Sequence, residues 1–316
     1  MAQPHDAVQP LDSIASRIAT HAMPNALRPL PPLLLLGTIW GATPVFVKHL
    51  GALGWPPMLI ATWAGAGSAA ILLAVCRLRG IFVPLSRAHL RHYAVSGLFG
   101  MALANLVGFT SLQHVPAGFF ALLVPLSPML TVLGAAALGM ERATRRRVLG
   151  TALGCAGVLL AMSPGAALPD PAMLPWALLA ALTPACYAAS NLLAVRLAPQ
   201  GTPPLALAAG TLVAGGLQSA AFALLTGQMQ PPSMPGMPVG LLQICATAAA
   251  FLLYFRSLAA HGGVVTSQTG YIVTLTGIAW GWMLFGERPG WLTIPAAALV
   301  FAGLALVTLP GGRRPQ

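Results

Sequence analysis

Residues 56–76 read PPMLIATWAGAGSAAILLAVC, a stretch with no Asp, Glu, Lys, Arg or His. A helix of about 20 residues is about 30 Å long, which matches the hydrocarbon thickness of a bilayer. About ten stretches of this kind, each of roughly 20 residues, follow one another between Pro31 and Pro310. Membrane-spanning strands would alternate polar and apolar residues, but these runs are continuously apolar. The sequence therefore predicts an all-α integral membrane protein with ten transmembrane helices.

Pro, Gly and charged residues separate the apolar stretches and mark the expected ends of the helices. The expected spans are 32–52, 56–76, 93–113, 116–139, 145–163, 172–194, 203–227, 238–259, 263–285 and 290–309. Residues 1–30 are too polar to cross a membrane or to act as a cleavable signal peptide. We expect them to form a cytosolic tail, and residues 311–316 to form a short basic tail.

The composition excludes most soluble classes of protein. The chain of 316 residues is 57% hydrophobic and 7% charged, whereas soluble domains carry about 25% charged residues. The formal net charge of +11 does not indicate nucleic-acid binding, because the basic residues lie in short connections and form no soluble domain. We therefore expect the lipid bilayer, and no nucleic acid, as a partner.

Basic residues gather on alternate connections, which predicts the orientation of the chain. If the N-terminus is cytoplasmic, one side receives Arg17, Arg28, Arg77, Arg79, Arg87, Arg91, Arg142, Arg145, Arg146, Arg147, Arg196, Arg256, Arg313 and Arg314. The opposite side receives Lys48 and Arg288. Because cytoplasmic loops are enriched in Lys and Arg, we expect a multi-pass protein of the plasma (inner) membrane with both termini in the cytoplasm.

The chain repeats itself with a shift of 146 residues. This shift places Glu141-Arg142 on Glu287-Arg288 and Ser111-Leu112 on Ser257-Leu258. We expect two repeats, 31–165 and 166–310, of five spans each. Because five is odd, the two repeats must enter the membrane in opposite directions around a central cavity. Inverted repeats of this kind are typical of secondary transporters, with the substrate site between the halves.

The sequence resembles the drug/metabolite transporter superfamily, and within it the EamA-type ten-helix transporters. The residues that carry the resemblance are Trp40-Gly41, Lys48, Glu141-Arg142-Ala143-Thr144, Gly150, Gly157, Glu287-Arg288-Pro289-Gly290, Ala296 and Gly303. Trp63 departs from the pattern, because many members carry Arg there. The resemblance implies two inverted five-helix repeats around a central cavity, and export or exchange of amino acids, metabolites or drugs.

The positions of the few acidic residues argue against proton coupling through a carboxylate in the membrane. Asp6, Asp12 and Asp170 lie in the tail or a loop, and Glu141 and Glu287 lie at matching helix ends. A proton-coupled carrier that uses a carboxylate needs one at mid-bilayer, where burial raises its pKa. No nucleotide-binding Gly-x-x-x-x-Gly-Lys-Ser/Thr run exists. We expect neither an enzyme nor a direct ATP-driven pump, and no catalytic residue, metal or cofactor.

Polar and aromatic residues inside the spans are the candidates for substrate contact, because an amide or hydroxyl that faced lipid would lack a partner. The candidate substrate-binding residues are Trp40, Asn105, Tyr187, Asn191, Tyr254, Gln268, Tyr271 and Thr274. The alternative role for each is to join helices to one another.

Four charged residues near span ends are candidates for gating or for attracting a charged substrate, namely Lys48, Glu141, Arg256 and Glu287. The alternative for the two cations is that their long side chains reach the lipid headgroups. The alternative for the two acids is a structural position at the N-terminus of the following helix, next to an Arg.

These observations predict a secondary transporter that exports amino acids or related metabolites by alternating access. A multidrug exporter and an organic-anion exchanger of the same fold are the alternatives within transport. A membrane receptor or structural protein without flux is the alternative outside it. Small-residue pairs such as Gly150 and Gly154 allow close helix packing within the monomer, and a homodimer stays open as a second reading.

Overall fold

The computed structural model describes residues 30–139, 144–163, 168, 170–267, 269–288 and 290–308. Over these residues the chain forms helices and no extended strand. Within the described chain, seven helical segments are long and apolar enough to cross a membrane. Two shorter apolar helices, Thr269–Phe285 and Thr293–Val307, follow them. The prediction of an all-helical, multi-pass membrane protein is thereby confirmed at this level.

The helices have the following bounds in chain order. They are α2 (Leu30–Ala52), α3 (Pro57–Leu78), α4 (Arg87–Gly97), η1 (Leu98–Ala102, a π-helix), α5 (Leu103–Leu112), α6 (Ala117–Leu123), α7 (Leu126–Ala137), α8 (Arg145–Ala161), η2 (Pro171–Met173), α9 (Leu174–Ala180), α10 (Leu182–Leu197), α11 (Pro204–Leu225), η3 (Met234–Gly236), α12 (Met237–Ser267), α13 (Thr269–Phe285) and α14 (Thr293–Thr308).

Proline and glycine mark the helix ends that their chemistry favours. Helices α3 and α11 begin at Pro57 and Pro204, because proline lacks an N–H that the first turn would leave unpaired. After α3 and α11, the chain turns at Gly80 and Gly227 with φ of 64° and 67°. Such left-handed backbone is costly for residues with a side chain and free for glycine.

Two expected boundaries differ from the structure. The expected break at His261-Gly262-Gly263 is wrong, because α12 continues through it to Ser267. Glycine is tolerated inside a membrane helix, where no water competes for the backbone hydrogen bonds. The expected span 93–113 begins earlier, since α4 starts at Arg87. Long cationic side chains in that first turn can extend to the headgroup region while the backbone stays helical.

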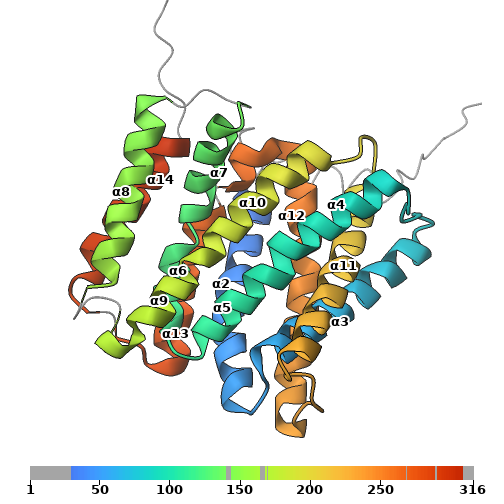
Figure 1. Cartoon of the computed structure of the whole chain (residues 1–316), viewed down its shortest axis with the longest axis horizontal. Coiled ribbons are helices and arrows are strands. Elements are labelled where there is room, and N and C mark those ends of the chain that lie inside the picture. Colours follow the sequence, from blue (N-terminus) through green and yellow to red (C-terminus); the bar gives the residue numbers. More distant parts are fainter. Residues whose placement is uncertain are drawn as a thin grey trace, which may run out of the picture.

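Helices from the two sequence halves pack in pairs across the molecule. Helix α8 packs along α14 and α3 packs along α11, at the left and right sides of Figure 1. Helix α2 packs along α13 between them. A Cβ added to Gly150 would lie 2.6 Å from the carbonyl oxygen of Gly303, so the backbones of α8 and α14 are in close contact. Small residues permit this approach in membrane helices.

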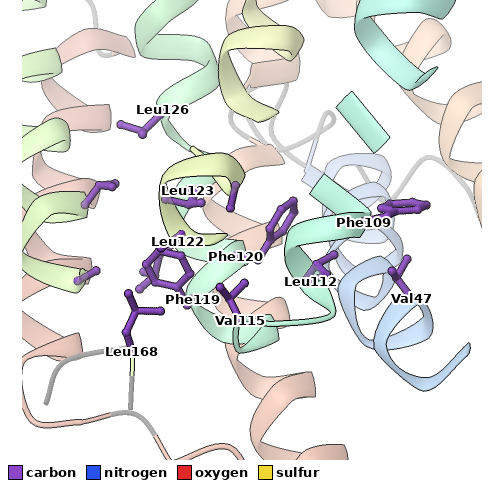
Figure 2. Close-up of a cluster of buried hydrophobic side chains, with 14 of the residues drawn as sticks. Val47, Phe109, Leu112, Val115, Phe119, Phe120, Leu122, Leu123, Leu126 and Leu168 are labelled. Carbon is purple, nitrogen blue, oxygen red and sulfur yellow. The ribbon is translucent and has the colours of Figure 1, made fainter. Parts of the chain in front are cut away.

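The largest cluster of buried apolar side chains surrounds α6. Phe119, Leu122 and Leu123 project from this helix, and Val47 of α2 and Phe109 of α5 belong to the same cluster, as Figure 2 shows. Phe119 and Leu123 are each 1% exposed. Close packing of this kind supplies the dispersion energy that holds membrane helices together, since lipid is as apolar as the core. It fixes α6 against α2, α8, α9 and α13.

Candidate functional site

Four side chains from four helices form a continuous polar and aromatic row, which we call the polar chain. It consists of Trp40 on α2, Tyr254 on α12, Asn191 on α10 and Thr131 on α7. The Trp40 and Tyr254 ring centroids are 5.4 Å apart with an interplanar angle of 49°. The Tyr254 hydroxyl donates to Asn191 Oδ1 at 3.0 Å, and Asn191 Nδ2 donates to Thr131 Oγ1 at 3.4 Å.

The hydrogen bonds of the polar chain all run in one direction. The Thr131 hydroxyl accepts from Asn191 and donates in turn to the Ser127 carbonyl oxygen at 2.8 Å. Tyr254, Asn191 and Thr131 are all part-buried. Inside a membrane such groups must be satisfied by protein or by a bound polar molecule. The polar chain therefore presents two hydroxyls, one amide and two aromatic rings at a junction of four helices.

Two further candidates lie on helices that border this junction. Tyr187 precedes Asn191 by four residues on α10, which places the two on the same helix face. Asn105 is 9% exposed on α5, and α5 packs against α10. Tyr187 and Asn105 remain predicted substrate contacts, Tyr187 on the helix that carries Asn191 and Asn105 on a helix that packs against it.

Three candidates on or before α13 have a different placement. The Tyr271 ring stacks on Phe301 of α14, with centroids 5.7 Å apart and an interplanar angle of 22°. Thr274 is fully buried, and its hydroxyl donates to the Ala121 carbonyl oxygen at 2.9 Å, which joins α13 to α6. Gln268 lies outside the described residues. The structure thus gives Thr274 the helix-joining position that was the alternative to substrate contact.

Glu287 forms the centre of a second polar site, which we call the Glu287 clamp. Its Oε1 accepts from the Lys48 ammonium at 2.8 Å and from the Ala117 amide at 2.8 Å. Its Oε2 accepts from the Gly118 amide at 2.9 Å. Lys48 belongs to α2, and Ala117 and Gly118 form the first turn of α6. One carboxylate therefore ties together the ends of α2, α6 and α13.

The electrostatics of the clamp follow from its position. The first amides of a helix lack carbonyl partners within the helix and carry partial positive charge. A carboxylate that accepts from them and from an ammonium makes strong, charge-assisted hydrogen bonds. Lys48 Nζ also lies 5.2 Å from the centroid of the Phe285 ring, within the range of a cation–π contact. The side chains of Lys48 and Glu287 are 23% and 16% exposed.

The clamp corrects the structural reading of Glu287. That reading placed its carboxylate at the N-terminus of the following helix, next to an Arg. The carboxylate instead reaches α6, and its charged partner is Lys48. The neighbouring Arg288 is exposed. The reading that Lys48 reaches the headgroups is likewise replaced by this ion pair, while Arg256 on α12 is exposed and Glu141 lies outside the described residues.

Further polar contacts close the same end of the bundle and were not found from the sequence. Trp55 Nε1 donates to Ser233 Oγ at 3.0 Å, and the Ser233 hydroxyl donates to the Leu53 carbonyl oxygen at 2.6 Å. Gln228 Oε1 accepts from the Met58 amide at 2.9 Å. The break Gly-Trp-Pro-Pro at 54–57 was the only signal, because a tryptophan beside two prolines in a short loop needs a partner for its N–H.

We call this end of the bundle, which carries the clamp and the loops 53–56, 113–116 and 226–233, the Glu287 end. Short loops make successive helices alternate in direction, so the opposite end carries the loops 79–86 and 198–203. The exposed cations of that end, which we call the arginine end, are Arg77, Arg79, Arg87, Arg91, Arg145 and Arg196. In Figure 1 the arginine end is uppermost, with the starts of α4 and α8.

Comparison with known proteins places this geometry in a family. The sequence profile of the EamA-like transporter family matches residues 32–163 and 175–309. The chain is 27% identical over 285 residues to the uncharacterized inner membrane transporter YedA of Escherichia coli (strain K12), covering 88% of this chain and 89% of that protein. It is 26% identical over 230 residues to the uncharacterized transporter YyaM of Bacillus subtilis (strain 168), covering 72% and 73%.

A solved crystal structure has the same overall arrangement of the chain. It superposes with a TM-score of 0.63 at 23% sequence identity, and the match covers 88% of this chain and 98% of that one. At this identity the likeness concerns the fold alone.

Proposed function

The chain belongs to the EamA-like transporter family and is a multi-pass membrane transporter, and we propose that it exports small organic solutes across the inner membrane by alternating access. Amino acids or related metabolites are the proposed substrates. The polar chain is the proposed substrate site, and the Glu287 clamp is the proposed gate at one end. The observation that carries the proposal is the polar chain, which joins four helices through two hydroxyls, an amide and two aromatic rings.

The proposed architecture is a pair of inverted repeats, 31–165 and 166–310, of five helices each. The internal register supports it. Adding 146 to the bounds of α8 gives 291–307, which overlaps α14 (Thr293–Thr308), and adding 146 to α3 gives 203–224, which overlaps α11 (Pro204–Leu225). Helices α8 and α3 thus each pack along their own counterpart in the second proposed repeat. The pair α2 and α13 corresponds in the same way to α10 and α7, which also pack together.

Pairs of this kind are what a two-fold axis in the membrane plane would produce. Helices near the axis meet their own counterparts, and pairs away from it occur twice. The polar chain takes Trp40 and Thr131 from the first proposed repeat and Asn191 and Tyr254 from the second. Substrate sites between inverted repeats lie where the two halves can rock against one another.

The chemistry of the polar chain favours neutral or zwitterionic solutes. Tyr254, Asn191 and Thr131 can donate and accept hydrogen bonds, and Trp40 offers an apolar face. The polar chain itself contains no carboxylate to hold a cationic drug and no cation to hold a phosphate. Lys48 has its charge matched by Glu287. These features support amino acids or related metabolites over the multidrug and organic-anion alternatives.

The proposed orientation places the arginine end, and both termini, in the cytoplasm. Cations are enriched on the cytoplasmic side of membrane proteins, and the exposed arginines gather at the arginine end. The Glu287 end then faces the outside and is closed by the clamp. Export would require the clamp to separate, so that α2, α6 and α13 move apart and the polar chain meets the outer solution.

Flux in proteoliposomes tests the proposal. Reconstituted protein is offered three probes in parallel, namely a ¹⁴C-labelled amino-acid mixture, a labelled sugar phosphate and a cationic dye. We expect protein-dependent flux of the amino acids. Flux of the dye or the sugar phosphate instead would favour a multidrug exporter or an anion exchanger, and flux of none would favour a receptor or structural role.

Variants connect that flux to the polar chain. Asn191→Ala removes both of its hydrogen bonds and Tyr254→Phe removes one while keeping the ring beside Trp40. We expect about tenfold weaker apparent affinity in each, which corresponds to a hydrogen bond of about 1.4 kcal/mol, with normal membrane insertion. Tyr271→Ala is also expected to lower flux. Thr226→Ala at the exposed end of α11 is the matched control, and unchanged flux in Asn191→Ala, Tyr254→Phe and Tyr271→Ala would remove these residues from the site.

A further inference from the structure

His92 is a buried histidine whose ring has no hydrogen-bond partner. It lies on α4 and is 1% exposed. Among the described residues, neither Nδ1 nor Nε2 meets a donor or acceptor. A polar atom buried without a partner costs about 1–3 kcal/mol, and native structures retain few such groups without a functional reason.

Other polar groups of this interface are also buried and lack a hydrogen-bond partner among the described residues. Ser96 follows by one turn on the same face of α4, is 4% exposed and has an unpartnered hydroxyl. The Tyr93 hydroxyl and the Thr211 hydroxyl of α11 are also buried and have no hydrogen-bond partner in the part of the chain that the structure describes, and the Tyr93 ring lies against Gly210 of α11. The interface of α4 with its neighbours therefore contains several buried polar groups for which the described residues provide no hydrogen-bond partner.

The charges around this interface are few and named. Helix α11 contributes no ionisable side chain to it. Helix α10, which also packs on α4, carries Cys186, Tyr187 and Arg196, and Arg196 is exposed. Neighbouring α3 brings Cys76 and the exposed Arg77, and η1 brings no ionisable group. On α4 itself the ionisable groups are Arg87, His89, Arg91 and Tyr93. Among the described residues, none of these forms an ion pair with His92.

The face of α4 that carries His92 leads to the polar chain. Gly100, eight residues beyond His92, lies where a Cβ would be 2.6 Å from Ser190 Oγ. Ser190 precedes Asn191, which holds the Tyr254 hydroxyl. Gly100 belongs to the π-helix Leu98–Ala102, and single π turns inside helices occur frequently at functional sites. Helix α4 therefore runs from His92 and Ser96 into η1, where Gly100 lies against Ser190, the residue before Asn191 of the proposed substrate site.

We propose that His92 is a proton-binding site that couples solute export to proton movement. The inference rests on the proposed function and supplies the coupling group that the spans otherwise lack. Histidine is the side chain whose ordinary pKa, about 6.5, allows it to change charge near neutral pH. In the closed interface a charged ring would have neither water nor an anion. Protonation therefore favours the conformation in which α4 separates from α10 and α11. The proton and the solute then favour different conformations of the bundle, which couples their movements in opposite directions.

Imposed pH gradients test the proposal in proteoliposomes with the ¹⁴C-labelled amino-acid mixture. With the interior more acidic by about one pH unit, exchange of one proton per solute permits about tenfold accumulation. We expect wild-type protein to approach this ratio. His92→Gln is expected to equilibrate the label without accumulation. The matched control is His89→Gln on the same helix, because His89 already has Ser86 and Thr202 as ring partners at 2.7 and 2.9 Å, and we expect it to keep the accumulation.

The outcomes separate the coupling site from the transport activity. No uptake of any probe by wild-type protein would overturn the proposed function. Uptake without accumulation in wild-type protein, or accumulation retained by His92→Gln, would overturn only the role of His92. If His92→Gln does not fold, wild-type protein in detergent provides the decision. Proton release when the amino-acid mixture is added, read with a pH dye, supports the proposal, and its absence contradicts it.

Discussion

The Glu287 end and the arginine end of the bundle are held together by different interactions. At the Glu287 end, side chains join residues far apart in the sequence, such as Lys48 with Glu287 and Trp55 with Ser233. Towards the arginine end, the described polar links between elements include the His89–Thr202 hydrogen bond and the bond that Gln218 Nε2 donates to the Ala94 carbonyl oxygen at 3.0 Å, and the cations around them are exposed. The Glu287 end therefore has specific bonds that must break before it can open.

For the proposed alternating access, this difference predicts the main barrier at the Glu287 end. Opening the Glu287 end separates a carboxylate from an ammonium and from two helix amides. Opening the arginine end by moving α4 breaks the neutral His89–Thr202 and Gln218–Ala94 hydrogen bonds and exposes His92 and its buried neighbours. A ligand shifts a conformational equilibrium only when it binds the two states with different affinity. Opening each end therefore needs a ligand that binds more tightly to the form in which that end is open.

The largest expected effect comes from removing the centre of the clamp. Glu287→Ala leaves Lys48 and the Ala117 and Gly118 amides without their acceptor. We expect a loss of about 2 kcal/mol in the free energy of unfolding, less than for a fully buried pair because both side chains are partly exposed. Thermal unfolding in detergent measures it. Exchanging the charges in Lys48→Glu with Glu287→Lys should not restore stability, since the amides need an acceptor, and a full rescue would show that the ion pair alone matters.

A smaller effect is expected from crowding the carboxylate without removing it. A Cβ added to Gly281 would lie 2.5 Å from Glu287 Oε2, whereas one added to Gly118 would lie 3.5 Å from the same atom. Gly281→Ala is therefore expected to cost about 1 kcal/mol by displacing the carboxylate from α6. Gly118→Ala is the matched control and is expected to change stability by less than about 0.5 kcal/mol. Equal melting temperatures for the two variants would contradict this geometry.

The smallest expected effects compare single hydroxyls at the two ends. Ser233→Ala removes the hydroxyl that accepts from Trp55 and donates to Leu53, leaving Trp55 only the Ser233 carbonyl oxygen at 3.3 Å, and should cost about 1 kcal/mol. Thr202→Val removes one partner of His89, which keeps Ser86, and should cost about 0.5 kcal/mol or less. Melting temperatures of both variants, measured side by side, test the order. A larger loss in Thr202→Val would reverse the comparison between the ends.

Much of the fold follows from the sequence because apolar length is a direct physical signal. Residues 57–78 and 204–225 form helices within a few residues of the expected spans, since a bilayer permits no other arrangement of a long uncharged run. The break at His261-Gly262-Gly263 was wrong for the same kind of reason. Glycine ends helices where water can bind the freed backbone groups, and inside a membrane that alternative is absent.

The candidate site was predictable in kind and only partly in detail. Composition indicated that Trp40, Asn191 and Tyr254 should face the interior, and the structure brings these three together. It could not indicate that Thr274 joins α13 to α6, because the acceptor is a carbonyl oxygen, which every residue carries. His92 was missed for a similar reason, since it follows a run of cations that points to a solvated helix end.

The sequence by itself determined that this protein lies in a membrane and consists of helices, and it marked Lys48 and Glu287 as rare charges near span ends. These properties depend on local transfer free energy, which each residue carries wherever it lies. Only the tertiary structure decided which helix end receives the Glu287 carboxylate and that His92 is buried. Both depend on contacts between elements more than 100 residues apart, and such contacts follow from packing that no local pattern encodes.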